Sequence, residues 1–107
     1  MKPMGPIPPD FRGQHGILAI GGQSVAALAD VAGDTPFFVY DLGVVRAHAA
    51  RLRAALPASV AIHYAIKANP FAPLVAAMAG MVDGLDVASE GELALALASG
   101  GREISFA

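Results

Sequence analysis

The stretch VAIHYAIKANP, residues 60–70, decides how this chain can fold. An alternating run begins at Val60, which is typical of a β-strand, and Asn69-Pro70 then marks a turn. Lys67 stands where the run gives way to the turn. Most lysines are solvated surface residues, whereas this one follows what reads as a buried strand. The sequence therefore marks Lys67 as a candidate functional residue.

Strand-like and helix-like segments alternate on both sides of this stretch. Val45, Ala49, Leu52 and Leu56, for example, recur at helical spacing until Pro57. The predicted elements, in chain order, are a strand over 17–22, a helix from Ser24 to Ala32 ended by Gly33, a strand over 37–42, a helix over 44–56, a strand over 59–69, a helix over 73–82, a strand over 84–89, a helix over 92–100 opened by a Ser89/Glu92 capping box and ended by Gly100 or Gly101, and a strand from 103 onward. Strands and helices joined by short connections predict βαβ units and a parallel sheet, whose strands we expect to be covered on both faces.

The totals exclude several classes of function. The chain has 107 residues, of which 55% are hydrophobic, and its formal net charge is -2, so no basic surface for nucleic acid or an anionic membrane is visible. It has no cysteine, and its histidines lack metal-ligand spacing, so we expect no metal site. Residues 1–13 are rich in proline and glycine and read as an arm or a disordered tail without a signal sequence. We expect a cytoplasmic chain with a small-molecule partner.

The chemistry is expected at the carboxyl ends of the strands, because the loops there can carry polar groups. Lys67 and Asp86 both stand at such ends. Strand alternation puts His63, Ala65 and Lys67 on one face, and the small Ala65 leaves room beside the lysine. A desolvated lysine loses its proton more easily, and the neutral amine is the nucleophile that forms a Schiff base. Lys67 is therefore the predicted reactive group.

Four segments carry a resemblance to a known family. In chain order they are TPFFVYDL (35–42), HYAIKANP (63–70), DGLDVASEGEL (83–93) and ISFA (104–107). In this order and spacing they resemble the N-terminal portion of the fold type III pyridoxal-phosphate-dependent decarboxylases, the group of the ornithine, diaminopimelate and arginine decarboxylases. The lysine strand together with Asp-Val-Ala-Ser-x-Gly-Glu makes the resemblance specific. MKPMGPIPPDF and LAIGG near the start also resemble a bacterial branch of this family associated with exosortase loci.

The resemblance implies an α/β fold, a (β/α)8 TIM barrel that binds pyridoxal phosphate, a β-domain built partly from residues before the barrel, and a homodimer. Residues 1–34 would then be the arm and a β-domain segment, and residues 35–107 a partial barrel. A complete barrel takes roughly 250 residues, and this chain stops within a predicted strand, as if it were cut. We therefore expect the 107 residues alone to have no sustained decarboxylase activity, whereas a longer parent protein would decarboxylate an amino acid or diamino acid.

The resemblance also implies roles for individual residues. The lysine that matches Lys67 holds pyridoxal phosphate as an internal aldimine, and Asp86 and Glu92 match acidic positions near it that can receive the freed ammonium, with Asp86 also near the cofactor. Other readings stay open: Asp86 can be a loop carboxylate, and Glu92 can be the capping-box partner of Ser89, or both. We expect His63 to be a hydrogen-bonded core residue that lies too deep to reach the cofactor ring.

Two alternative functions remain. The first is a non-catalytic homologue that binds a partner protein, against which the retention of Lys67, Asp86 and Glu92 argues. The second is a pyridoxal-dependent amino-acid racemase, which also carries a lysine at the end of its first barrel strand. The segment DVASEGEL (86–93) favours the decarboxylases.

Overall fold

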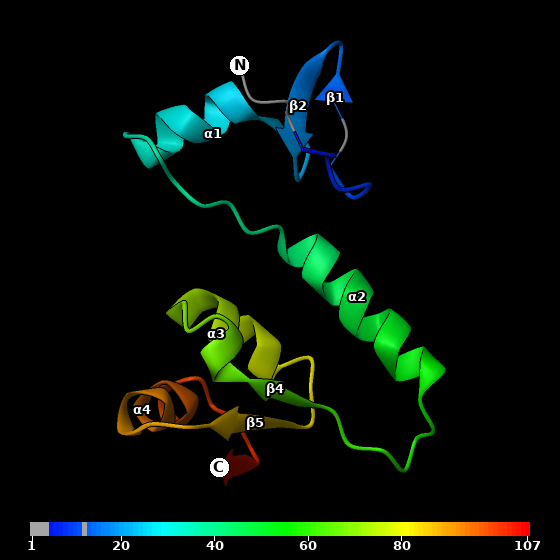
Figure 1. The fold of residues 1–107 in the computed structure, drawn as a ribbon, viewed down its shortest axis with the longest axis vertical. Coiled ribbons are helices and arrows are strands. Elements are labelled where there is room, and N and C mark those ends of the chain that lie inside the picture. The colour runs from blue at the N-terminus through cyan, green and yellow to red at the C-terminus, as the bar shows by residue number, and fades with distance from the viewer. Residues whose placement is uncertain (1–4, 12) are drawn as a thin grey trace. The chain divides into compact units, whose positions relative to one another are not determined.

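The structure, a computed structural model, describes residues 5–11 and 13–107. Its elements are β1 (Gly13–Gln14), β2 (Ile17–Ile20), β3 (Gln23–Ser24), α1 (Val25–Ala32), α2 (Leu42–Ala55), β4 (His63–Ala65), the 3-10 helix η1 (Ile66–Ala68), α3 (Ala72–Ala79), β5 (Gly84–Val87), α4 (Glu90–Ala98) and β6 (Ile104–Phe106) (Figure 1). The chain divides into two compact units, the first ending at Val44 and the second beginning at Val45. None of the helices in the described ranges has the length and apolarity to cross a bilayer.

The first unit contains a small antiparallel sheet in the order β1-β2-β3 and the helix α1. Strand β2 confirms the strand predicted at 17–22. Helix α1 is also confirmed, since the Ser24 hydroxyl accepts a hydrogen bond from the Ala27 amide at 3.2 Å and Gly33 ends the helix at a φ of 80°. Strands β1 and β3 were not predicted, because two residues are too few to show alternation. Of the predicted arm over 1–13, residues 1–4 and 12 lie outside the described residues.

The strand predicted over 37–42 is wrong. Residues 37–41 form neither a helix nor a strand, and Leu42 already belongs to α2. The Phe38 and Tyr40 rings stack with centroids 6.5 Å apart, and Phe38 is 89% exposed. Aromatic and β-branched residues favour a strand only where the backbone finds a partner strand, and the described part of the chain pairs nothing with this segment. Asp41 instead caps α2 by accepting from the Gly43 amide at 2.8 Å.

The second unit is built on a parallel sheet in the order β4-β5-β6. Helix α3 connects β4 to β5, and α4 connects β5 to β6, so the predicted βαβ units and parallel sheet are confirmed. The register places Ala65 opposite Asp86 and Leu85 opposite Ile104. All three strands therefore end at the same edge of the sheet.

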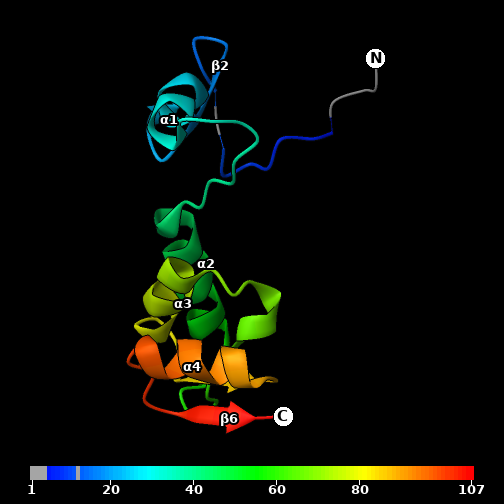
Figure 2. The same cartoon turned by 90° about the vertical axis from the view of Figure 1, so that its left-hand side faces the viewer.

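Helices cover one face of this sheet. Leu85 and Val87 of β5 are 0% and 1% exposed, and they form the core with Ile66, Val75 and Ala96. Figure 2 shows α3 and α4 on the same side of the sheet. The opposite face carries His63, Asp86 and Glu103 and has no helix over it in the part of the chain that the structure describes. The expectation of cover on both faces is therefore wrong for these residues.

The predicted strand over 59–69 is much shorter than expected. Only His63–Ala65 pairs as β4, and Lys67 lies on η1, where the Asn69 amide donates to the Ile66 carbonyl at 3.0 Å. Ile66 is apolar and fully buried, so the apolar alternation that predicted the strand continues past the end of β4 into the turn. Over three or four residues, a strand and a 3-10 turn bury the same apolar position, which is why alternation did not separate them.

Arg53, near the end of α2, forms hydrogen bonds with the segment that leads into β4 and with the residue before β5. Its Nη2 donates to the carbonyls of Pro57 and Val60 at 2.9 and 2.6 Å, and its Nη1 lies 3.2 Å from Oδ2 of Asp83. The same Asp83 oxygen accepts from the Ile62 amide at 2.7 Å. This arginine therefore fixes the path of the chain into β4.

Candidate functional site

The structure brings the three predicted site residues to one pocket at the carboxyl edge of the parallel sheet. Lys67 comes from η1, Asp86 from β5 and Glu92 from the first turn of α4. The pocket has a volume of about 80 Å³, and its other lining residues are Ala65, Val87, Ala88 and Ala107. The small side chains leave the lysine and the two carboxylates as its charged groups. Parallel strands bring such ends together whatever the sequence distance between them.

Lys67 is placed by its neighbours and is itself exposed. Ile66 anchors the turn in the core, and the Tyr64 hydroxyl donates to the Asn69 carbonyl at 2.9 Å on the other side of the lysine. Among the described residues, the Lys67 amine forms no ion pair. Lys67 is exposed among the described residues, so the burial that would favour its neutral amine is not present there.

Glu92 confirms the capping box and also contributes to the pocket. The Ser89 hydroxyl accepts from the Glu92 amide at 3.1 Å and donates to Oε2 of Glu92 at 3.1 Å. Oε1 of Glu92 is buried and has no hydrogen-bond partner among the described residues. A buried carboxylate oxygen without a donor is unfavourable, so this atom is an available acceptor for a ligand.

Asp86 is held by a histidine from the neighbouring strand. Nδ1 of His63 lies 2.9 Å from Oδ1 of Asp86, and their side chains are 20% and 43% exposed. The sequence predicted a hydrogen-bonded core His63 without naming its partner. The hydrogen bond is confirmed, but the core position is wrong, because the side chain is 20% exposed on the face of the sheet that no described helix covers. Alternation puts Asp86 on the opposite face of β5 from Leu85 and Val87, whereas the register that brings His63 beside it is not encoded in any local pattern.

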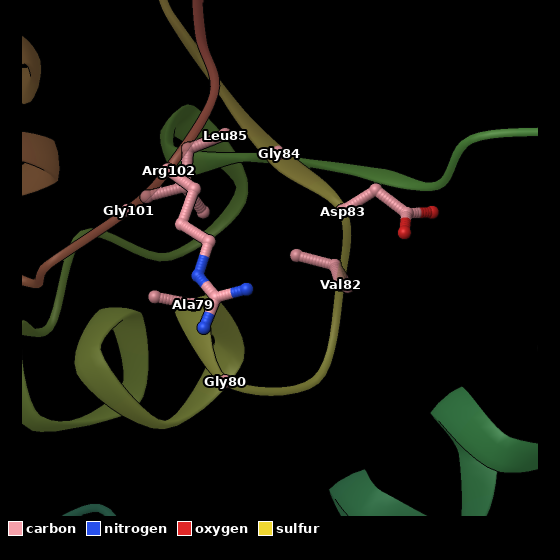
Figure 3. A pocket seen from close by; sticks show the side chains of 8 residues that line it. All are labelled: Ala79, Gly80, Val82, Asp83, Gly84, Leu85, Gly101 and Arg102. Atoms are coloured by element: carbon pink, nitrogen blue, oxygen red, sulfur yellow. The ribbon is translucent and has the colours of Figure 1, made fainter.

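Two larger hollows in the second unit have less suitable chemistry. An apolar groove of about 360 Å³ runs between α2 and α3, and it has no carboxylate or lysine in its wall. A pocket of about 270 Å³ lies at the amino end of β5, where Arg102 points across toward Ala79 and Gly80 at the end of α3 (Figure 3). A cation is favourable beside the carbonyls that end a helix, which gives Arg102 a structural role. The lysine pocket therefore remains the candidate site.

Comparisons with known proteins identify a family to which this chain is similar. Residues 42–106 match the family described as "Pyridoxal-dependent decarboxylase, pyridoxal binding domain". Diaminopimelate decarboxylase of Bacillus subtilis (strain 168) is 40% identical over 92 residues, which cover 81% of this chain and 20% of that relative. 2-[(L-alanin-3-ylcarbamoyl)methyl]-2-hydroxybutanedioate decarboxylase of Staphylococcus aureus (strain NCTC 8325 / PS 47) is 34% identical over 61 residues, which cover 57% of this chain and 15% of that relative. The chain thus spans a fifth or less of the length of these curated relatives. No solved structure gives a significant match.

Proposed function

Because this chain belongs to the pyridoxal-dependent decarboxylase family, whose cofactor is pyridoxal phosphate, we propose that the protein decarboxylates an amino acid with the cofactor held covalently on Lys67. The observation that carries the proposal is the convergence of Lys67, Asp86 and Glu92 on one pocket. An exposed lysine amine that shares a pocket with two carboxylates is suited to a covalent bond with an aldehyde and to the exchange of one amine for another.

The described residues fit the reactive end of the cofactor. The pocket has a volume of about 80 Å³ and is open to solvent on one side, so it offers space for a small reactive group beside Lys67. The exposed Lys67 amine is accessible to an aldehyde, and the unpaired Oε1 of Glu92 can accept a hydrogen bond from a bound amine. The rest of the cofactor would lie beyond this pocket.

Each of the three residues has a distinct part in the proposed reaction. When bound, pyridoxal phosphate supplies an electron sink for the pair released as carbon dioxide leaves. Lys67 would hold and orient the cofactor, and once released by the substrate amine its Nζ would take up the proton that the substrate ammonium gives up. Asp86 and Glu92 line the same pocket as Lys67, and in the proposed reaction their carboxylates would accept hydrogen bonds from that ammonium.

The substrate class follows from the relatives rather than from this chain. One relative is named for diaminopimelate, and the other is named for a different carboxylate substrate. We include a diamino acid in the proposal as the first substrate class to test.

The architecture in the proposal is a partial (β/α)8 barrel, with residues 35–107 as its first part and residues 1–34 belonging to a β-domain. One observation supports it: the helices cover only the face of the sheet that carries Leu85 and Val87, as the outer face of a barrel wall would be covered. A homodimer in the cytoplasm is also part of the proposal, and sedimentation of the full-length protein tests its oligomeric state.

The test is a covalent label on Lys67. The full-length protein is incubated with pyridoxal phosphate, reduced with borohydride and digested with trypsin. Because trypsin does not cut at a modified lysine, we expect the pyridoxyl mass on the uncut peptide 54–102. Lys67→Arg is the control, since it keeps the charge but cannot form the bond. The only other lysine in this sequence is Lys2, so a label on peptide 54–102 is unambiguous. No label there in the wild-type protein would contradict the proposal.

A second measurement separates the alternatives. Release of carbon dioxide from ornithine, lysine, arginine or diaminopimelate supports a decarboxylase. Inversion at the α-carbon without carbon dioxide indicates a racemase. A labelled protein that does neither with any of these substrates would point to a non-catalytic homologue.

A further inference from the structure

His63 occupies a defined place below the lysine pocket. It stands opposite Gly84 in the β4-β5 register, while Asp86 stands one pair further along, opposite Ala65. A Cβ added to Gly84 would lie 2.7 Å from both Cε1 and Nε2 of His63, so the imidazole ring lies directly over the bare glycine backbone. The missing side chain at position 84 is what lets the ring reach sideways to Asp86.

The hydrogen bond restricts the Asp86 carboxylate. Asp86 is 43% exposed, and a carboxylate at that exposure can adopt several rotamers unless something holds it. Nδ1 of His63, at 2.9 Å, engages Oδ1. Oδ2 is left outside this bond and is available to the pocket that Asp86 shares with Lys67.

The two nitrogens of His63 have unequal partners. Nε2 lies 3.6 Å from Oε1 of Glu103, which is beyond hydrogen-bond distance, and the Glu103 side chain is 65% exposed. The bond to Asp86 is therefore the short contact of this ring. Because a carboxylate can only accept, Nδ1 must carry the proton.

We propose that His63 is a positioning residue for the reaction: its Nδ1–H holds Asp86 in the one rotamer that faces the released Lys67 ammonium. This inference rests on the proposed function. It assigns to His63 no contact with substrate or cofactor, and it assigns to Gly84 the role of leaving space for the ring. A structural role alone would require only that the ring fill space over Gly84.

The test uses a matched pair of amide variants in the full-length protein. In His63→Asn the side-chain amide stands near the place of Nδ1 and can still donate to Asp86. In His63→Gln it reaches to the place of Nε2, nearer Glu103. His63→Phe is the third variant, a ring of similar shape without a donor. Each variant is first checked for the borohydride label on Lys67.

We expect kcat to fall about tenfold in His63→Gln and His63→Phe with KM changed less than about twofold, and His63→Asn to recover most of the loss, as for one hydrogen bond to a charged group. Crystal structures of the cofactor-free variants are the independent measurement. They should show one Asp86 rotamer in the wild type and His63→Asn, and several or a rotated one in His63→Gln. If His63→Phe does not fold, the amide pair decides.

The outcomes distinguish the two proposals. Absence of the Lys67 label in the wild-type protein would contradict the proposed function, and the rotamers would still report on the hold of His63 on Asp86. Normal labelling and an unchanged kcat in His63→Gln, or a single unchanged Asp86 rotamer in that variant, would overturn the positioning role alone. In an Asp86→Ala background, His63→Gln should cause no further loss of kcat, and an additive loss would also overturn it.

Discussion

The two faces of the sheet β4-β5-β6 differ although they are made by alternate residues of the same strands. On one face, Leu85 and Val87 are at most 1% exposed and pack against helices. On the other, Asp86 is 43% exposed and meets His63 and the lysine pocket. The strand GLDV, residues 84–87, thus separates packing from chemistry by the two-residue period of a strand. Substitutions on the two faces should therefore change different measurements.

The largest effect on stability is expected on the packed face. Leu85→Ala removes a side chain that is 0% exposed, and the cavity should lower the free energy of unfolding by about 2–5 kcal/mol. Urea denaturation of the full-length protein measures this loss. The folded fraction should still take the borohydride label on Lys67. The matched control is Leu97→Ala on α4, since Leu97 is 65% exposed and should change stability by less than about 0.5 kcal/mol. Equal losses in both variants would contradict the comparison.

The next largest effect on stability is expected from a methyl group added at Gly84, on the face of the sheet that no described helix covers. Gly84→Ala places a Cβ 2.7 Å from the His63 ring, which must move, at a cost of about 1–3 kcal/mol. Gly91→Ala is the control within α4, because its Cβ would meet nothing closer than 4.0 Å, and it should stabilise the protein by about 0.4–1 kcal/mol. Thermal unfolding of both variants checks the difference in sign. A Gly84→Ala variant as stable as the wild type would show that the ring is not confined.

Ser89 contributes both to packing and to the site, because it caps α4 and its hydroxyl bonds Glu92 of the lysine pocket. Ser89→Ala removes the cap of α4 and should cost about 1 kcal/mol, measured by urea denaturation. It also frees Oε2 of Glu92, so the variant should label more slowly on Lys67 at equal folded concentration. Ser89→Thr keeps the hydroxyl and should resemble the wild type. Slow labelling of Lys67 in Ser89→Thr would show that the labelling rate does not depend on the hydroxyl at this position.

The smallest effect on stability is expected at the reactive lysine. Lys67 is exposed and forms no ion pair within the described residues, so Lys67→Met should change the free energy of unfolding of the cofactor-free protein by less than about 0.5 kcal/mol. The covalent label should be lost completely. A large loss of stability would mean that the lysine is held by contacts from another part of the protein.

What could be predicted from the sequence depends on how local its causes are. Both caps of α1 and the N-cap of α4 were predicted, because Ser24, Gly33 and Ser89 act within three or four residues of themselves. The predicted C-cap of α4 at Gly100 or Gly101 is wrong, since the C-cap lies one residue earlier, at Ser99. The meeting of Lys67 with Asp86 was predicted because parallel strands share a carboxyl edge. The absence of a strand over 37–41 depends on whether a distant segment pairs with it, which no local pattern states.

The site was predicted less completely than its three residues suggest. The bond between His63 and Asp86 needs the exact β4-β5 register, and the role of Gly84 appears only once the ring is placed over it. The bonds of Arg53 to Pro57, Val60 and Asp83 depend on where the chain turns after α2, so no local pattern predicts them. Side-chain partners across elements are thus what the sequence left open.

The hydrogen bond from the Tyr64 hydroxyl to the Asn69 carbonyl closes a loop of six residues around the lysine. Loops this short lose little chain entropy on closing, so this turn can form early during folding, before β5 and α4 bring the carboxylates. The turn that holds the Lys67 amine can therefore form without Asp86 and Glu92. Residues 64–69 form a unit that a designer could transplant to the end of another parallel strand and expect to keep its shape.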